Sequence, residues 1–251
     1  MILARLSAAI RAQNWLAVAL EFVIVIAGVV IGFQIAGASE RVASLQYERD
    51  LLERLHGQII SLEEGREYNR RWVSMKRDRL VEVRPLIFGV AESEAIDSRQ
   101  CFALLESHWL ANPADALPAL DELVSTGRME TIRNHQIRER AGRYLQMRDV
   151  ARRQIESDLE SLVSLPDRFP DYFHVELIPD PEEEDDGWDR RSVCQLDAMR
   201  ADGAFQLYAS GNIEIYRNLL NFHYDFVGDQ LESLHTALDA ELGHQHAETS
   251  P

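Results

Sequence analysis

Basic side chains are scarce in this sequence. It holds 26 Lys and Arg residues against 42 Asp and Glu residues, which gives a formal charge of -16, and Lys76 is the single lysine. Almost all the acidic residues follow position 39. A chain of this charge repels polyphosphate backbones and anionic headgroups. The soluble part is therefore not expected to bind nucleic acid or an anionic membrane surface.

The common catalytic fingerprints are missing as well. There is no glycine-rich phosphate loop, no His-Glu-x-x-His, no Gly-x-Ser-x-Gly and no Cys-x-x-Cys. The sequence therefore predicts neither an enzyme nor a bound cofactor.

One metal-site spacing does occur. Glu-x-x-His, which carboxylate-bridged metal sites of helical bundles use, is found as Glu53/His56, Glu232/His235 and Glu241/His244. The last two pairs are nine residues apart, which would place them on opposite faces of one helix. Glu53 and Glu232 each follow an apolar position, so their side chains should point to the flank. We expect no metal ion, and a metal site in the bundle is the alternative.

Three histidines and three tryptophans have less specific interpretations. His223 falls within an apolar stripe, which favours a packed core histidine. His244 and His246 lie in a polar C-terminal tail and are expected to be solvated. Trp72, Trp109 and Trp188 fit either packing or contact with a partner.

The sequence has one long hydrophobic run. From Trp15 to Ala38 it reads WLAVALEFVIVIAGVVIGFQIAGA, and at about 1.5 Å per residue a helix of this length covers a hydrocarbon core of about 30 Å. Residues 15–38 are therefore predicted to be a transmembrane helix after a short segment, 1–14. A cleaved signal peptide is the alternative, because Arg5 and Arg11 precede the run and Ala36-Gly37-Ala38 resembles a cleavage site.

The orientation of this span is only weakly encoded. The segment before the span contains Arg5 and Arg11, and the segment after it contains Arg41, Arg49 and Arg54. The numbers of basic residues on the two sides of the span are therefore nearly equal. No acidic residue precedes the span, and a long following domain can be translocated regardless of its charge. We therefore expect a cytoplasmic N-terminus and a soluble domain outside the cytoplasm.

Five residues of the span have possible roles beyond lipid contact. Glu21 lies near the Trp15 end, where a carboxylate can reach the headgroups or meet a charge on another helix. Gly28, Gly32 and Ala36 recur every four residues and form a stripe on which a second helix can pack closely, and Gln34 can add an interhelical hydrogen bond. The span predicts a homo-oligomer, with simple lipid exposure as the alternative.

The soluble domain, residues 39–243, is predicted to be all-α. A long membrane-proximal helix should run from Ser39 to Arg84 and end before Pro85, with a coiled-coil-like seam that is apolar near the membrane and polar in its middle, packed within the domain. Further helices are predicted at 92–111 and at 114–126, the second with Gly127 as the left-handed cap. Another should follow an N-cap at Asn134 and end before Pro166, and a last one should run from about Asn212 to Leu242.

These amphipathic helices favour an antiparallel bundle. Residues 169–191, with three prolines and the acidic run 182–186, are predicted to be a loop, and 244–251 a polar tail. The acidic run aligns poorly with a calcium loop.

Cysteine is nearly absent, and both cysteines lie in the soluble part. If that part faces an oxidising compartment, Cys101 and Cys194 can form a disulfide. Two buried free thiols are the alternative.

Three segments of the chain carry a resemblance: NWLAVALEFVIVIAGVVIGFQIAG, YERDLLERLHGQI and ALDELVSTGRMETIRNHQIRERAGRYL. They resemble an uncharacterised family of Gram-negative bacterial single-span, mostly helical membrane proteins. The resemblance implies a helical, inner-membrane protein and brings no known activity. The chain departs from it at the exit from the membrane, where Gly37-Ala38-Ser39-Glu40 stands in place of a Trp-Asn-Glu-like sequence.

The sequence thus predicts a membrane-anchored, non-enzymatic interaction or scaffold module with a periplasmic helical domain. Its expected partners are lipid, a second copy bound through the span, and a membrane or periplasmic protein. A periplasmic bundle that senses a ligand and signals laterally to a membrane partner is the alternative.

Overall fold

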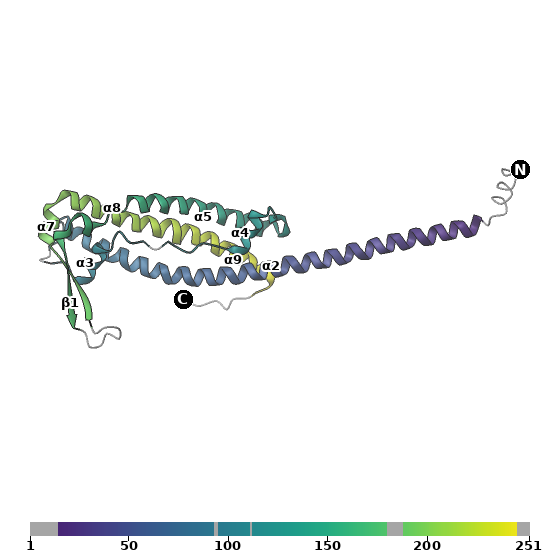
Figure 1. Ribbon diagram of the computed structural model, residues 1–251, viewed down its shortest axis with the longest axis horizontal. Coiled ribbons are helices and arrows are strands. Elements are labelled where there is room, and N and C mark those ends of the chain that lie inside the picture. The colour runs from purple at the N-terminus through teal and green to yellow at the C-terminus, as the bar shows by residue number, and fades with distance from the viewer. Residues whose placement is uncertain (1–14, 93–94, 111, 180–187, 245–251) are drawn as a thin grey trace. The chain divides into compact units, whose positions relative to one another are not determined.

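The computed structural model describes residues 15–92, 95–110, 112–179 and 188–244 (Figure 1), and for residues 15–18 and 188 it describes only the backbone. Its contacts divide the chain into two units, Met1–Leu51 and Leu52–Pro251. The described chain is mostly helical and includes one two-stranded hairpin. The predicted segments 1–14 and, apart from His244, the tail lie outside the described residues.

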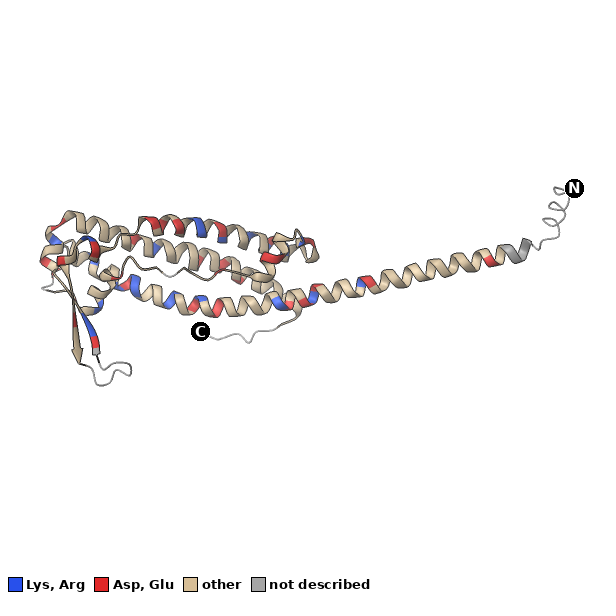
Figure 2. Cartoon of the chain, in the orientation of Figure 1, with Lys and Arg blue, Asp and Glu red and all other residues tan. Residues whose placement is uncertain are grey.

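The first unit is dominated by the apolar part of α2, a helix that runs from Trp15 to Ile87. Between Glu21 and Glu40 the helix carries no charged residue (Figure 2), and its large apolar side chains are exposed. Within the described residues α2 is the one helix long and apolar enough to cross a membrane, and none of its most apolar stretch is buried by the chain. A signal sequence near an N-terminus can also meet these criteria of length and apolar composition, so the segment fits either a membrane span or a signal.

In the second unit, the rest of α2 packs along the predicted seam. The buried positions recur at the expected spacing: Leu52, Leu55, Ile59, Leu62, Arg66, Val73, Lys76, Leu80 and Val83. The prediction that this helix packs within the domain is confirmed, including the polar residues in its middle. The expected end before Pro85 is wrong. Only the last turn follows the proline, so few backbone bonds are lost, and Gly89 then turns the chain with a φ of 66°.

The middle of the chain holds less helix than predicted. In place of one helix over 92–111, α3 spans Ser98–Leu105, and Asp97 begins it with a capping box to Gln100. α4 spans Pro118–Ser125, and Gly127 has the predicted left-handed conformation, with a φ of 66°. A short 3-10 helix, η1, follows at Met129–Thr131.

Two long helical segments complete the second unit. α5 spans His135–Ser161, and the side chain of Asn134 caps it as predicted by accepting from the Gln136 N–H at 2.9 Å. The last segment consists of α8 (Gly203–Leu219), a π-helical turn η3 (Leu220–Phe226) and α9 (Val227–Leu242). It begins well before the predicted Asn212, because Asp202 caps α8 by accepting from the Ala204 and Phe205 N–H groups.

Asn212 is instead a buried connector between helices. Its amide oxygen accepts from the Val163 N–H at 3.1 Å, and its amide nitrogen donates to the Val163 carbonyl at 2.8 Å. These two bonds satisfy both backbone groups of the half-buried Val163, just beyond the end of α5.

Cross-helix hydrogen bonds fix the directions of the long helices. Asn134 bonds Glu241 and Val163 bonds Asn212, so α5 is antiparallel to α8–α9. Glu63 bonds His235 and Ile87 bonds Gln206, so α2 is antiparallel to α8–α9 as well. α2 and α5 therefore run in the same direction.

The segment before α4 explains this arrangement. Lys76 donates a hydrogen bond to the Trp109 carbonyl, and Arg66 donates one to the Ala114 carbonyl. The Ala119 N–H, in the first turn of α4, donates to the Gln58 side chain. Because these partners lie at successively earlier positions of α2, the segment returns along that helix. The described residues between α3 and α4 are not helical, so this crossing replaces only the parts of the two predicted helices that lie between Leu105 and Pro118.

The prediction of a loop at 169–191 is wrong, because the described part of this segment contains two paired strands. α6 (Leu165–Arg168) and η2 (Pro170–Tyr172) lead into β1 (Phe173–Pro179), which pairs antiparallel with β2 (Trp188–Cys194) before α7 (Leu196–Ala201). The fold is therefore not all-α. The acidic run 182–186 lies outside the described residues.

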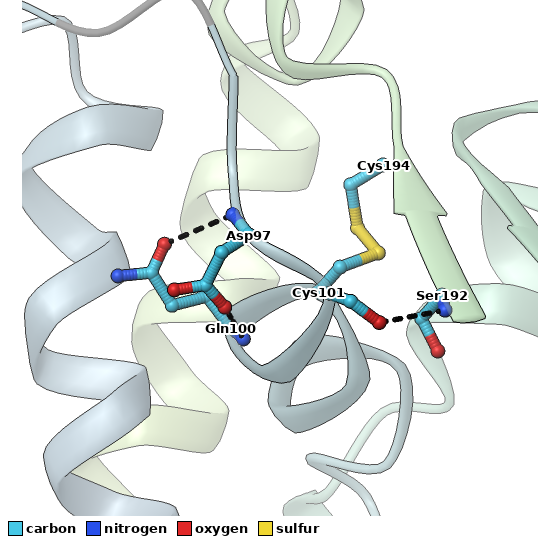
Figure 3. Close-up of a disulfide and its surroundings, with 6 residues drawn as sticks. Asp97, Gln100, Cys101, Ser192 and Cys194 are labelled. Carbon is cyan, nitrogen blue, oxygen red and sulfur yellow. Dashed lines mark hydrogen bonds between the residues drawn. A yellow bond between two sulfur atoms is a disulfide. The ribbon is translucent and has the colours of Figure 1, made fainter. Parts of the chain in front are cut away.

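The disulfide between Cys101 and Cys194 is present and joins α3 to β2 (Figure 3). Cys101 is fully buried. Beside the disulfide, the Ser192 N–H donates to the Ser98 hydroxyl at 3.0 Å. The disulfide and this hydrogen bond together hold the hairpin against a core cluster that includes Ile87, Leu104 and Phe205.

Candidate functional site

Three potential metal ligands meet where α2 packs on α9. His56 comes from α2, and His235 and Asp239 come from α9, four residues apart and therefore on one helix face. We call these residues the histidine cluster. One donor atom from each lies within 4.8 Å of the other two.

The donor atoms of the cluster are close and face one another. His56 Nε2 is 2.8 Å from Asp239 Oδ1 and 3.2 Å from His235 Nε2, and His235 Nε2 is 3.7 Å from the same carboxylate oxygen. The side chains are only 9%, 16% and 20% exposed for His56, His235 and Asp239. An open groove lined by Glu63, Arg66, Leu231 and Thr236, among others, reaches His235 and Asp239 from solvent.

Two carboxylates and a third histidine surround the cluster. Glu63 Oε2 lies 2.8 Å from His235 Nδ1. Burial raises the pKa of Glu63, and the neighbouring His235 opposes that shift. The ring of His244 stacks on His56 with centroids 4.7 Å apart, and its Nε2 is 3.8 Å from Glu53.

The Glu-x-x-His prediction is partly right. Glu53 and Glu232 do lie on the flank, with Glu232 exposed, and neither belongs to the cluster. The expectation that His235 and His244 lie on opposite faces is wrong, because α9 ends at Leu242 and Gly243 turns the chain with a φ of 75°. Sequence reasoning missed Asp239 and Glu63, although the His-x-x-x-Asp spacing of 235 and 239 was a usable signal.

A second feature is a recess walled by aromatic rings, which we call the aromatic recess. Its volume is about 210 Å³. It is lined by Tyr68, Asn69, Trp72, Val73 and Lys76 of α2, by Trp109 and Leu110, and by Tyr216 and Tyr224. Tyr68 is 71% exposed, Trp109 65% and Trp72 46%. The rim of the recess is therefore formed by aromatic side chains that carry a polar group and are exposed to solvent.

Lys76, the single lysine, forms part of the recess wall. Its ammonium lies 3.7 Å from Glu106 and 5.7 Å and 5.6 Å from the ring centres of Trp72 and Tyr216. Burial lowers the pKa of Lys76, while Glu106 raises it. Tyr216 donates its hydroxyl to the Trp109 carbonyl at 2.7 Å, which holds the Trp109 segment in place.

His223 is packed in the core, as predicted. Only 2% of it is exposed, and its Nε2 lies 2.7 Å from the Ala151 carbonyl. The guanidinium of Arg66 donates to the backbone carbonyl of His223 and lies over the ring of Tyr224. Burial lowers the pKa of His223, whereas the bond to Ala151 raises it.

This burial predicts an acid-dependent loss of stability. Because the pKa of folded His223 is below its unfolded value of about 6.5, the unfolded chain takes up a proton first as the pH falls. The stabilisation is therefore complete above about pH 6.5 and declines as the pH falls toward the lower, folded pKa. Chemical denaturation at several pH values should show a smaller acid slope for His223→Gln than for the wild type. An unchanged slope, or an equal reduction in the exposed-site control His135→Gln, would contradict this role.

The predicted residues of the span are all exposed in the structure. These residues are Glu21, Gly28, Gly32, Gln34 and Ala36. A Cβ built on Gly28 or Gly32 would meet nothing within 4 Å. Their predicted roles in helix packing stay predictions.

Comparisons of the chain with protein-family models, with curated proteins and with solved structures found no match. The resemblance to the single-span membrane family therefore stays a prediction.

Proposed function

We propose that the protein is a single-pass protein of the bacterial inner membrane whose periplasmic domain is a non-enzymatic interaction module. Two observations support the location. The apolar part of α2 is exposed along its length, which suits lipid, and the Cys101–Cys194 disulfide suits an oxidising compartment.

The aromatic recess is the observation that carries the interaction role. Trp and Tyr dominate protein–protein hot spots, where a central pocket receives a side chain of the partner and the rim excludes water. At about 210 Å³ the recess is below the range of about 300–1000 Å³ typical of drug-sized ligands. It is large enough for one or two partner side chains, and its exposed Trp109 and Tyr68 would then be covered.

The span adds a second contact in this proposal. Gly28, Gly32 and Ala36 leave one face of the helix without bulky side chains, which allows the close backbone approach of a second copy, and Gln34 supplies a polar group for it.

Site-specific photo-crosslinking in native membranes tests the recess. A photoreactive residue replacing Trp109 should give one discrete adduct, and the Trp72→Ala substitution should lower its yield by about tenfold or more. The matched control is the same photoreactive residue at Leu207, which is 70% exposed on α8 and does not line the recess. An adduct of twice the chain mass would make a second copy the partner. Equal yields from both positions, or a yield unaffected by Trp72→Ala, would refute the proposal.

Ligand sensing is the second candidate, favoured by the amine of Lys76 in the wall of a concave, mostly apolar site. Native mass spectrometry of protein released gently from membranes separates the two. A small molecule that stays bound to the wild type and is absent from Trp72→Ala would select sensing over a protein partner.

A further inference from the structure

We propose that the histidine cluster is a zinc site, with His56 Nε2, His235 Nε2 and Asp239 Oδ1 as the three protein ligands. This inference does not depend on the proposed interaction role, because the cluster and the aromatic recess share no residue.

The spacing of the donor atoms fits one tetrahedral ion. Ligand distances of about 2.0–2.1 Å place neighbouring donors of a tetrahedral zinc roughly 3.3–3.4 Å apart. The three donor–donor distances are 2.8, 3.2 and 3.7 Å, so they bracket that spacing, and a single point lies within bonding distance of all three atoms.

Glu63 gives His235 the tautomer that a metal requires. When Glu63 is ionised it can only accept, so in that state its 2.8 Å contact places the ring hydrogen of His235 on Nδ1 and leaves the Nε2 lone pair directed into the cluster. A carboxylate that orients a ligating histidine in this way is a recurrent feature of zinc sites.

The ring of His56 must also present a lone pair on Nε2 to the ion. In the metal-free protein its Nε2–H can be donated to Asp239, 2.8 Å away. On binding, the ion takes that position, and the ring hydrogen of His56 is then carried on Nδ1.

Charge and access also suit a dication. Asp239 and Glu63, when ionised, carry the two negative charges that Zn²⁺ neutralises. Two imidazoles with one carboxylate form a donor set found in zinc sites and also in non-haem iron sites, whereas calcium and magnesium prefer oxygen ligands. Asp239 keeps 20% of its side chain exposed beside an open groove, so an ion can enter and a water can complete the fourth position.

The position of the site in the fold gives the ion a structural consequence. His56 is separated from His235 by 179 residues, and the two lie on different helices. A bound ion would therefore cross-link α2 to α9 and stabilise the folded second unit by mass action.

The test uses the full-length protein in detergent, treated with a chelator that is then removed. Calorimetric titration with Zn²⁺ should give one ion per chain. With free zinc at about one hundred times its Kd, the Tm should rise by about 5–10 °C. Co²⁺, used as a spectroscopic probe, should give the intense visible bands of a tetrahedral site.

Variants assign the ligands. Asp239→Asn and His56→Gln should weaken zinc binding by more than about 100-fold, and Glu63→Gln by about 10–100-fold. His174→Gln, at an exposed position of β1, is the matched control and should bind zinc as the wild type does. Circular dichroism establishes that each variant is folded, and Glu63→Gln, which leaves all three ligands in place, keeps the test decisive if His56→Gln unfolds.

Less than one ion per chain, wild-type affinity in Asp239→Asn, or an octahedral Co²⁺ spectrum would overturn the zinc site. An equal loss in His174→Gln would do the same, because it would place the bound metal on surface histidines.

Discussion

Opening the Cys101–Cys194 disulfide should lower the free energy of unfolding of the second unit by about 4–5 kcal/mol. The bridge closes a separation of 93 residues, and the chain-entropy model assigns a stabilisation of that size to so long a loop. Since small domains are stable by only about 5–15 kcal/mol, the reduced protein should approach marginal stability.

The position of the bridge explains why other contacts should not compensate for its loss. β1 and β2 form an isolated two-stranded sheet, which is marginal in water by itself. Apart from the disulfide, a 3.0 Å hydrogen bond from the Ser192 N–H to the Ser98 hydroxyl ties β2 to α3. The hairpin should therefore be the first part to loosen when the bridge opens.

Urea denaturation of the oxidised and reduced protein measures this effect, and Cys101→Ala/Cys194→Ala provides the matched control. The double variant should resemble the reduced wild type, and its own stability should not respond to reductant. Equal stability of the oxidised and reduced wild type would show that the bridge constrains little in the unfolded chain.

The sequence encodes the packing of α2 in the second unit clearly. Its seam was predictable because buried positions recur with a helical period, from Leu52 to Val83, and two of its polar members, Arg66 and Lys76, remain buried with partners. The caps at Asn134 and Gly127 were predictable because their chemistry is local.

Contacts between distant segments were not predictable in the same way. Asp239 and Glu63 join the histidines only because α2 and α9 are antiparallel in one particular register. The start of α8 was missed because Asn212, a typical N-cap residue, is used to satisfy the Val163 backbone. The hairpin was missed because prolines and acidic residues hid two short strands, one of which is held by the disulfide.

The full-length chain should remain in the membrane after alkaline carbonate extraction, at its intact mass of 28.7 kDa. The reason is the exposed apolar surface of α2, where side chains such as Phe22, Ile31 and Phe33 are at least half exposed. Exposure of this surface to water is unfavourable in free energy, whereas exposure to lipid is not. A mass that corresponds to removal of residues 1–38 would instead identify this segment as a cleaved signal.

Charged substitutions separate a span from a segment that merely associates with the membrane. An arginine at the centre of a spanning helix costs about 2.5–3.5 kcal/mol on insertion scales, so Ile26→Arg/Val29→Arg should lose most of its insertion. Val42→Arg, at an exposed position beyond the predicted span, is the control and should insert normally. Equal membrane retention of the two variants would rule out a spanning helix.

The same variants report on the side of the membrane that the domain occupies. If the domain is periplasmic, only inserted chains reach the compartment that oxidises Cys101 and Cys194, so loss of insertion and loss of the disulfide should occur together in Ile26→Arg/Val29→Arg. Non-reducing electrophoresis of the membrane and soluble fractions measures both at once. A disulfide that forms fully in the non-inserted chains would separate the bridge from the topology and remove the strongest support for a periplasmic domain.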